Sequence, residues 1–361
     1  MAARIVLLAN NVDEIGGAQR VVHALAAGFV SRGHDVTVIG IEPREPLGDF
    51  STAGYRVERL LDSAYDKEEG PALLAQRAAA LAKLQSILDS GPHGIIITAQ
   101  VWAMEHIAQC TLVGWRTIGQ YHSSYQAACF GPDLQRVVSA YADCDRFLAL
   151  TSQDASAFTS AGLNNAGAMP NPIARWPQQR ADPQARVITY LGRFSAEKAP
   201  MMLMQAWRIL AEAGQLADWR LQFVGSGPHE EQIREAAAAL PRVQVRDQVD
   251  DPYAVLSQTG ILALPSLVEG LPLVMMEALA CGVPIVASDC SAGVRELLAD
   301  ESCGVLVNRG DPADLARGLQ LLGADHGLRA GMASRGPVAM EPYRLAGVLD
   351  RWERVFAEVL R

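Results

Sequence analysis

Short continuous apolar runs, each followed by a segment with helical periodicity, recur along this chain of 361 residues. The first run is "RIVLLAN" at 4–10, and the next is "DVTVIGI" at 35–41. Between them, Val21, Leu25 and Phe29 recur at the spacing of one helix face. Continuous apolar runs are typical of strands buried on both faces, and parallel strands need a long crossover between them. The beginning of the chain therefore predicts a strand, a helix and a second, parallel strand.

The same alternation occurs twice along the chain. Between the two occurrences, periodicity is lost around prolines 170, 172, 177 and 183, where we expect an interdomain linker. The sequence thus predicts an α/β fold of two Rossmann-like domains, 1–171 and 172–341, followed by a C-terminal segment, 342–361. Ligands of such sheets bind outside the carboxyl ends of the strands, so we expect a central cleft where two sets of strand ends face each other. The further strands are expected at 93–100, 116–122, 146–152, 186–193, 219–227, 243–249, 260–266, 283–289 and 303–308.

Composition excludes several classes of protein. The chain is 50% apolar and 20% charged, without an apolar run long enough to cross a membrane. A net charge of −9 disfavours a nucleic-acid partner. The apolar run at the N-terminus is short and acidic residues follow it, so we interpret it as a buried strand rather than a signal peptide. The cysteines lack metal-ligand spacing and are expected to be reduced core residues of a cytoplasmic protein: Cys110, Cys129, Cys144, Cys281, Cys290 and Cys303.

Two loops carry residues suited to phosphate. Gly16 and Gly17 follow the first strand and precede a helix, whose free N–H groups can bind an anion, although a plain tight turn has the same sequence. Arg193 and Lys198 lie in "GRFSAEKAP" after a strand of the second half, where both could reach a diphosphate or simply be solvated. By contrast, "VGSGPHEE" lacks the third glycine of a dinucleotide fingerprint and is not in the first strand-to-helix turn, so we exclude a nicotinamide dehydrogenase.

Glu277 interrupts an apolar stretch, "LVMMEALAC". Pro272 and Gly282 predict a helix over 273–281 that is apolar on every side except at Glu277. A buried carboxylate without a partner is costly, so Glu277 needs either a structural partner, such as Arg295 or backbone N–H groups, or the hydroxyls of a ligand.

The loop before this helix adds further ligand-binding groups. Glu269 is a second carboxylate beside it, and the N–H groups at Gly270 and Leu271 suit a phosphate oxygen. Together with Glu277, this set of groups fits a nucleoside diphosphate sugar.

The stretch "PSLVEGLPLVMMEALACGVPIVASD" at 265–289 resembles the E-x7-E segment of the family-4 retaining glycosyltransferases, which have the GT-B fold. The G-R-x4-K of "GRFSAEK" resembles the same family, as do "GGAQRVVHALAAGFVSRGHDVTVI", "FVGSGPHEEQI" and "CGVLVNRGDPADLARGL", in the family's order. One departure is Ser291-Ala292-Gly293 in place of the family's Gly-Gly. The resemblance implies a C-terminal helix at 342–361 that crosses back to the first domain. It also implies transfer of a hexosyl unit from a nucleoside diphosphate sugar, expected to be a UDP-sugar, with retention and without a metal or other cofactor.

The resemblance also implies roles in binding the donor. Glu277 would hold the ribose hydroxyls. Glu269 would contact the donor sugar, with the N–H groups of Gly270 and Leu271 nearby. Val249 would pair with the base through its main chain.

Further roles concern the reacting centre. Arg193 and Lys198 would bind the diphosphate and stabilise its charge as it leaves, and Gly16 and Gly17 would approach the same phosphate from the first domain. His122 would contact the donor sugar near the reacting carbon, although a histidine packed in a loop is the simpler interpretation of this residue alone.

Other functions remain open at the level of sequence. A GT-B epimerase acting on a nucleotide sugar would need no acceptor, and a sugar phosphorylase would need inorganic phosphate or pyridoxal phosphate. A non-catalytic subunit would be expected to lose Arg193, Lys198 or Glu277, and all three are present. The acceptor is expected to be a soluble small molecule or glycan precursor, since the helical segment 71–91 has only Arg77 and Lys83 as cations and no aromatic anchor. A lipid-linked or polymeric acceptor is the alternative.

Overall fold

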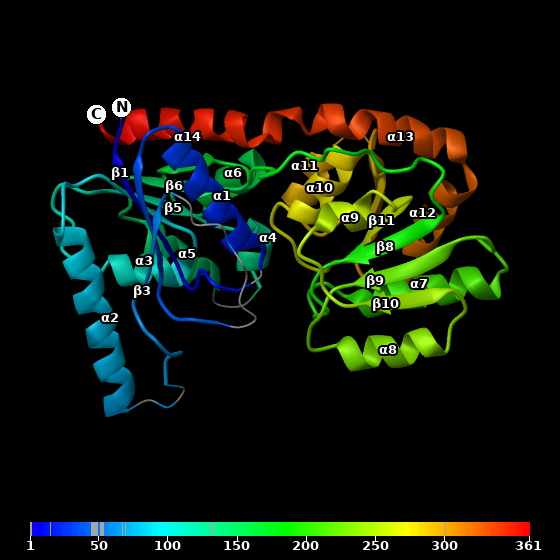
Figure 1. Cartoon of the computed structure of the whole chain (residues 1–361), viewed down its shortest axis with the longest axis horizontal. Coiled ribbons are helices and arrows are strands. Elements are labelled where there is room, and N and C mark those ends of the chain that lie inside the picture. The colour runs from blue at the N-terminus through cyan, green and yellow to red at the C-terminus, as the bar shows by residue number, and fades with distance from the viewer. Residues whose placement is uncertain are drawn as a thin grey trace. The chain divides into compact units, whose positions relative to one another are not determined.

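The computed structural model describes residues 2–14, 16–44, 50, 54–66, 68, 70–130, 133–299 and 301–361. The chain forms two compact units, each built on its own parallel sheet with helices packed against it (Figure 1). Unit 1 contains Met1–Ala174 and Arg344–Arg361, and unit 2 contains Arg175–Tyr343. The change from one unit to the other thus falls among the prolines where a linker was expected.

Unit 1 has a seven-stranded sheet in the order β3-β2-β1-β4-β5-β6-β7, and all its strand pairs are parallel. The strand of "RIVLLA" lies between β2 and β4 and is buried along its whole length. Its continuous apolar run therefore follows from helices covering both faces. The strands are β1 (Arg4–Ala9), β2 (Asp35–Gly40), β3 (Arg56–Arg59), β4 (Ile95–Thr98), β5 (Arg116–Gln120), β6 (Arg146–Ala149) and β7 (Ala166–Ala168).

Helices connect these strands, and buried side chains from helices and strands form the core of unit 1. The helices are α1 (Gly17–Ser31), α2 (Pro71–Asp89), α3 (Val101–Ile107), α4 (Tyr125–Ala128), α5 (Asp133–Tyr141), α6 (Ser152–Ser160) and α14 (Leu345–Val359).

Unit 2 has a six-stranded parallel sheet in the order β10-β9-β8-β11-β12-β13. Its strands are β8 (Val187–Leu191), β9 (Arg220–Val224), β10 (Val243–Arg246), β11 (Ile261–Leu264), β12 (Ile285–Ser288) and β13 (Gly304–Val307). Its helices are α7 (Pro200–Glu212), α8 (Glu230–Ala238), α9 (Pro252–Leu256), α10 (Leu273–Cys281), α11 (Ala292–Leu297), α12 (Pro312–Ala324), α13 (His326–Ala339) and η1 (Glu341–Tyr343). In this order β8 and β11 are neighbours, although two strands separate them in the sequence.

The expected α/β architecture of two Rossmann-like domains is confirmed, but the sequence patterns missed β3 and β7. Both lie at the edges of the sheet of unit 1. β3 is the polar stretch "RVER" and β7 is only three residues long, and neither is buried. Edge strands need no continuous apolar run, because they are covered less completely than central strands.

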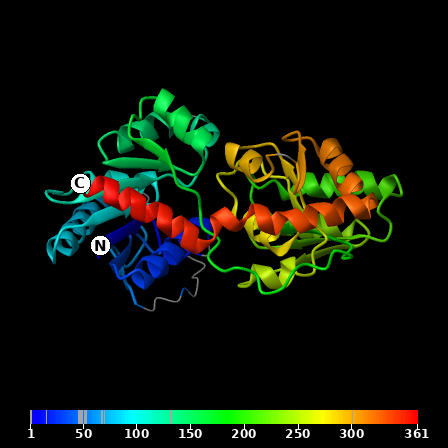
Figure 2. The same ribbon diagram turned by 90° about the horizontal axis from the view of Figure 1, so that it is seen from above.

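The C-terminal helix α14 packs against α1 in unit 1 (Figure 2). Trp352 is fully buried there, and its ring centroid lies 5.9 Å from that of Phe29 of α1. The helices approach so closely that a Cβ on Gly28 would lie 2.8 Å from a methyl carbon of Leu349. The buried His34 adds a hydrogen bond of 2.8 Å from Nε2 to the Glu353 carboxylate.

The cysteines were expected to lie in the core, and this holds for only some of them. Cys144, Cys281, Cys290 and Cys303 are buried, whereas Cys129 is exposed. Cys129 directly follows α4, which has only four residues and buries only Ala128, so the helix end does not cover the thiol. None of the helices among the described residues is long and apolar enough to cross a membrane.

Replacing Trp352 by alanine should remove a large part of the contact between α14 and unit 1. We expect a loss of about 3–5 kcal/mol in the free energy of unfolding, the cost typical of deleting a buried aromatic side chain. Urea unfolding followed by far-UV circular dichroism measures it. Glu358→Ala, an exposed position on the same helix, is the matched control and should change stability by less than about 0.5 kcal/mol. Equal stability of the two variants would contradict the packing described here.

Candidate functional site

Two loops of unit 2 meet at the carboxyl edge of its sheet. The loop after β8 carries Arg193 and Lys198, and the loop after β11 carries Glu269. Because β8 and β11 pair side by side, their carboxyl ends are adjacent. A backbone hydrogen bond from the Leu267 N–H to the Glu197 carbonyl, 2.7 Å long, ties the loops together.

Lys198 and Glu269 form an ion pair at this junction. The Lys198 ammonium donates to Oε2 of Glu269 over 2.7 Å, and the Ser266 hydroxyl donates to Oε1 over 2.7 Å. The Glu269 side chain is only 5% exposed, whereas that of Lys198 is 32% exposed. Both oxygens of the buried carboxylate are thus satisfied, and the ammonium, which has three N–H donors, can bind Glu269 and an anion together.

The "GSG" sequence after β9 supports the loop of Arg193. Gly225 and Gly227 have φ of +155° and +151°, a region that L side chains rarely adopt. A Cβ on Gly225 would lie 1.9 Å from the Gly192 carbonyl oxygen, and one on Gly227 would lie 2.6 Å from that of Phe194. Glycine is needed at both positions because one backbone packs directly on the other. The motif is therefore structural here.

The same loop presents Arg193 outward. Phe194 is fully buried, whereas Arg193 beside it is exposed. The Tyr190 hydroxyl donates to the Arg193 carbonyl over 2.6 Å, and burial raises the pKa of this phenol well above its usual value, so it stays protonated as a donor. Arg193 is thus an exposed residue on a loop whose backbone is held by these contacts.

Glu277 lies on the predicted helix. α10 spans Leu273–Cys281, with Pro272 at its N-cap and Gly282 in the left-handed conformation at its end, φ +79°. Glu277 is 5% exposed among apolar neighbours. Burial, and the negative charge of Glu277, raise the pKa of the Cys281 thiol to about 12. Arg295, one candidate partner, pairs with Asp289 through a contact of 2.6 Å between Nε and Oδ1.

The loop at Gly270 and Leu271 is packed against the N-terminus of α11. The Ser291 hydroxyl donates to the Gly270 carbonyl over 3.1 Å, and it also accepts from the Val294 N–H. A Cβ on Gly293 would lie 2.0 Å from the same Gly270 oxygen. The Ser-Ala-Gly sequence therefore caps the helix with a serine and keeps glycine at the closest approach.

Val249 lies half-buried in the loop between β10 and α9. Asp251, two residues further on, caps α9 by accepting from the Tyr253 N–H over 3.0 Å. This carboxylate thus has a structural role at the helix N-terminus.

In unit 1, Gly16 and Gly17 stand where the loop after β1 enters α1. Gly17 is the first residue of the helix, and Gly16 is an N-cap whose backbone is extended, a conformation open to any residue. Among the described residues, no side-chain hydrogen bond is made by the N-cap residue. A Cβ on Gly16 would lie 2.4 Å from Oε1 of Gln19, which is itself fixed by a hydrogen bond of 2.8 Å to Asn11. A side chain at position 16 would therefore force a shift of the Gln19 side chain, which occupies the space beside it.

His122 lies just after β5 in unit 1. Its Nδ1 is 3.2 Å from Oδ1 of Asn171, whereas Nε2 is covered and has no hydrogen-bond partner among the described residues. Burial lowers the pKa of the ring to about 4, and the bond to Asn171 opposes this shift only in part. His122 is therefore neutral near pH 7, with one ring nitrogen committed to Asn171.

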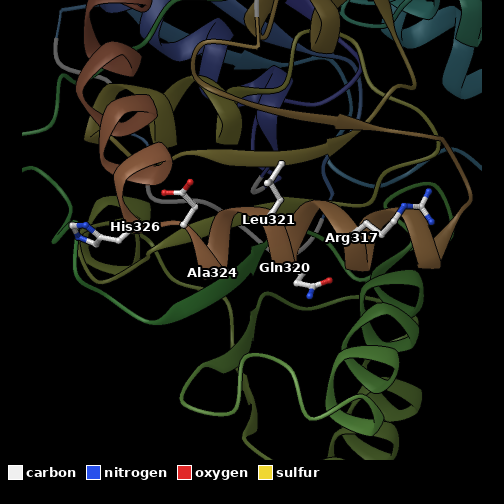
Figure 3. A pocket seen from close by; sticks show the side chains of 6 residues that line it. Arg317, Gln320, Leu321, Ala324 and His326 are labelled. Atoms are coloured by element: carbon white, nitrogen blue, oxygen red, sulfur yellow. The ribbon is translucent and has the colours of Figure 1, made fainter.

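A shallow hollow on unit 2 lies away from these groups. Figure 3 shows it along α12 and the start of α13. None of the residues expected in the site lines it. The lining residues are Arg317, Gln320, Leu321, Ala324, Asp325 and His326.

Ser266 and Asn171, which contact the expected site residues Glu269 and His122, were not identified from the sequence patterns. Ser266 stands at the end of a predicted strand, three residues before Glu269, which was a usable signal. Asn171 lies in the predicted linker, and nothing in its sequence neighbourhood indicated its contact with His122.

Comparison with sequence families gives two matches, one in each unit. Residues 15–174 match the family described as Glycosyltransferase Family 4, and residues 185–325 match the family described as Glycosyl transferases group 1. Over the whole chain, it is similar to an uncharacterized glycosyltransferase of Haemophilus influenzae, with 27% identity over 96% of this chain and 97% of that protein.

Solved structures share the fold at low sequence identity. A mutant of TarM from S. aureus, crystallised with fondaparinux, alpha-GlcNAc-glycerol and UDP, has a TM-score of 0.84 at 12% identity, covering 98% of this chain and 99% of that one. HepE from Anabaena, in complex with UDP and glucose, has a TM-score of 0.81 at 18% identity, covering 99% of this chain and 100% of that one.

The lowered pKa of His122 predicts a loss of stability in mild acid. Between about pH 6.5, where an unfolded histidine titrates, and the native pKa of about 4, the unfolded state holds one proton more than the native state. Stability should therefore decrease as pH falls through this window, by up to about 1.4 kcal/mol per pH unit from this residue.

Urea unfolding at a series of pH values tests this. His122→Gln lacks the titrating group and should show a shallower dependence on pH than the wild type in that window. Identical slopes for the two proteins would contradict the lowered pKa of His122.

Proposed function

This chain belongs to family 4 of the glycosyltransferases, with the GT-B fold, and we propose that it transfers a hexosyl unit from a UDP-sugar to an acceptor hydroxyl. The transfer proceeds with retention at the anomeric carbon and without a metal ion. The observation that carries the proposal is the buried Glu269 paired with the partly exposed Lys198, on loops that also carry the exposed Arg193. Support for the nucleotide comes from HepE, of similar fold, crystallised with UDP and glucose.

Arg193 and Lys198 take the diphosphate in this proposal. Charge builds on the leaving phosphate oxygen in the transition state, and fixed cations stabilise it there. Arg193 can bind two oxygens through its planar fork, and Lys198 acts as a point charge. We also propose that the N–H groups at the start of α1, at Gly16 and Gly17, bind a phosphate of the donor.

The two glutamates take the donor's hydroxyls. Glu277 accepts from the ribose and Glu269 from the sugar, with the N–H groups of Gly270 and Leu271 beside the phosphate, while Val249 pairs with the base through its main chain. Both carboxylates are nearly buried, so each is most stable when hydrogen-bond donors surround it.

The hydrogen bonds of Glu269 favour a mechanism in which no side chain of the enzyme attacks the anomeric carbon. Both oxygens of this carboxylate are bound, to Lys198 and to Ser266. We propose that the acceptor oxygen bonds to the anomeric carbon on the face from which the UDP oxygen departs. The acceptor's proton passes to that departing oxygen. His122 contacts the sugar beside this centre.

A soluble small molecule or glycan precursor is the proposed acceptor, and the protein is proposed to act in the cytoplasm without strong membrane binding. The alternatives are a lipid-linked or polymeric acceptor, and epimerisation of the nucleotide sugar. Product analysis and binding to vesicles distinguish them from the proposed reaction.

A screen of nucleotide sugars tests the proposal. Thermal shift should show stabilisation by UDP and by one UDP-sugar, because ligand binding to the native state raises the apparent stability. Incubation of that donor with small-molecule acceptors, analysed by mass spectrometry, should show a glycosylated product and free UDP, also in the presence of EDTA. An epimerised sugar, strict dependence on Mg²⁺ or Mn²⁺, or strong binding to anionic vesicles would each contradict one part of the proposal.

The cations Arg193 and Lys198 are expected to act mainly on turnover. Arg193→Ala and Lys198→Ala should each lower kcat by about a hundredfold to a thousandfold, because these groups act on charge formed in the transition state. Arg208→Ala, an exposed cation on α7, is the matched control and should leave kcat unchanged. Turnover close to that of the wild type in both site variants, with folding intact, would overturn the assigned roles.

Glu277→Gln separates ligand binding from structure. The amide keeps the shape and one acceptor oxygen, and it removes the cost of burying a charge. We expect weaker UDP binding by calorimetry, in a variant whose circular dichroism shows that it is folded. Wild-type UDP affinity in the folded variant would contradict the contact between Glu277 and the ribose.

A further inference from the structure

The bond between His122 and Asn171 determines which nitrogen of the ring carries the proton. The atom of Asn171 that faces Nδ1 is its carbonyl oxygen, at 3.2 Å. An amide oxygen only accepts hydrogen bonds, so Nδ1 must be the donor. A neutral imidazole has a single N–H, and Nε2 therefore presents a bare lone pair. This nitrogen is covered and has no partner among the described residues.

The backbone around Asn171 is held in place. Pro170 and Pro172 flank it, which fixes two φ angles and restricts Asn171 to extended conformations. Met169, just before, donates its N–H to the Ala149 carbonyl at the end of β6 over 2.8 Å. Asn171 itself is 5% exposed. Its side chain thus has little freedom to turn away from His122.

We propose that Asn171 is a positioning residue that holds His122 in the Nδ1–H tautomer, so that Nε2 accepts a hydrogen bond from a hydroxyl of the substrate. This inference rests on the proposed function, which places the donor sugar at His122. Asn171 acts through the histidine and does not itself contact substrate.

A fixed acceptor at Nε2 has a consequence for specificity. A substrate that donates an O–H to this nitrogen satisfies a buried polar atom, whereas a deoxy or O-methyl analogue leaves it without a partner. A site built to hydrogen-bond a hydroxyl strongly rejects analogues that lack this hydroxyl. The opposite tautomer would turn Nε2 into a donor and invert this preference.

The tautomer can be measured directly in the wild-type protein at pH 8, where the ring is neutral. Long-range ¹H–¹⁵N correlation spectra of protein labelled with ¹⁵N-histidine distinguish the protonated from the bare ring nitrogen. His122→Gln identifies the His122 signals among those of the 7 histidines. A protonated Nδ1 and a bare Nε2 support the inference, and a protonated Nε2 overturns it.

Variants at Asn171 separate positioning from general packing. Asn171→Asp keeps an oxygen acceptor and should retain the Nδ1–H tautomer at pH 8, whereas Asn171→Ala should lose it. We expect kcat of Asn171→Ala to fall by about tenfold to a hundredfold, the range for a misplaced catalytic contact, with UDP affinity within about twofold of wild type. Asn164→Ala, an exposed asparagine in the same region, is the control and should change neither. An unchanged tautomer in Asn171→Ala would overturn the positioning role.

Addition of ligand distinguishes this inference from the proposed function. UDP-glucose, UDP-galactose and UDP-N-acetylglucosamine are each compared with UDP alone. A change in the Nε2 resonance with a UDP-sugar, but not with UDP, supports the contact between His122 and the donor sugar. If the tautomer is as inferred but no UDP-sugar moves this resonance, the proposed contact with the sugar fails while the role of Asn171 in holding the tautomer remains.

Discussion

The candidate site in unit 2 depends on the ion pair between the partly exposed Lys198 and the buried Glu269. A carboxylate with 5% exposure is costly unless it is paired and hydrogen-bonded, and here one oxygen binds the ammonium and the other binds Ser266. The pair joins two loops from neighbouring strands and leaves the ammonium partly exposed. A negatively charged ligand can therefore bind to side chains that are already in position. This is the condition for electrostatic stabilisation without large rearrangement.

Close backbone contacts give these loops their shape. The glycines at 225 and 227 allow one loop to lie directly on another, and Gly293 does the same for the loop at Gly270. Such contacts leave no space for a side chain, so the positions of Arg193 and of the Gly270 loop are set by the backbone itself. The exposed guanidinium and the buried Phe194 beside it follow from this arrangement.

Unit 1 contains a neutral polar group whose position is also fixed by its neighbours. His122 is held by an asparagine fixed between two prolines, and burial keeps its pKa near 4. A ring that stays neutral and keeps one tautomer offers a hydrogen-bond acceptor that does not change over the usual range of pH. Unit 2 thus carries a lysine paired with a buried carboxylate, and unit 1 carries a neutral histidine.

The sequence by itself determined the central strands, the helix over 273–281 and the residues of the family's motif. Continuous apolar runs, Pro272 and Gly282 are local signals, and they act through local burial and backbone conformation. It could not predict the edge strands β3 and β7, which are short or polar. Only the tertiary structure brought Lys198 to Glu269, 71 positions apart, and Asn171 to His122, 49 positions apart. These pairings depend on which strands are neighbours in each sheet, and strand order is set by long-range packing that no local pattern encodes.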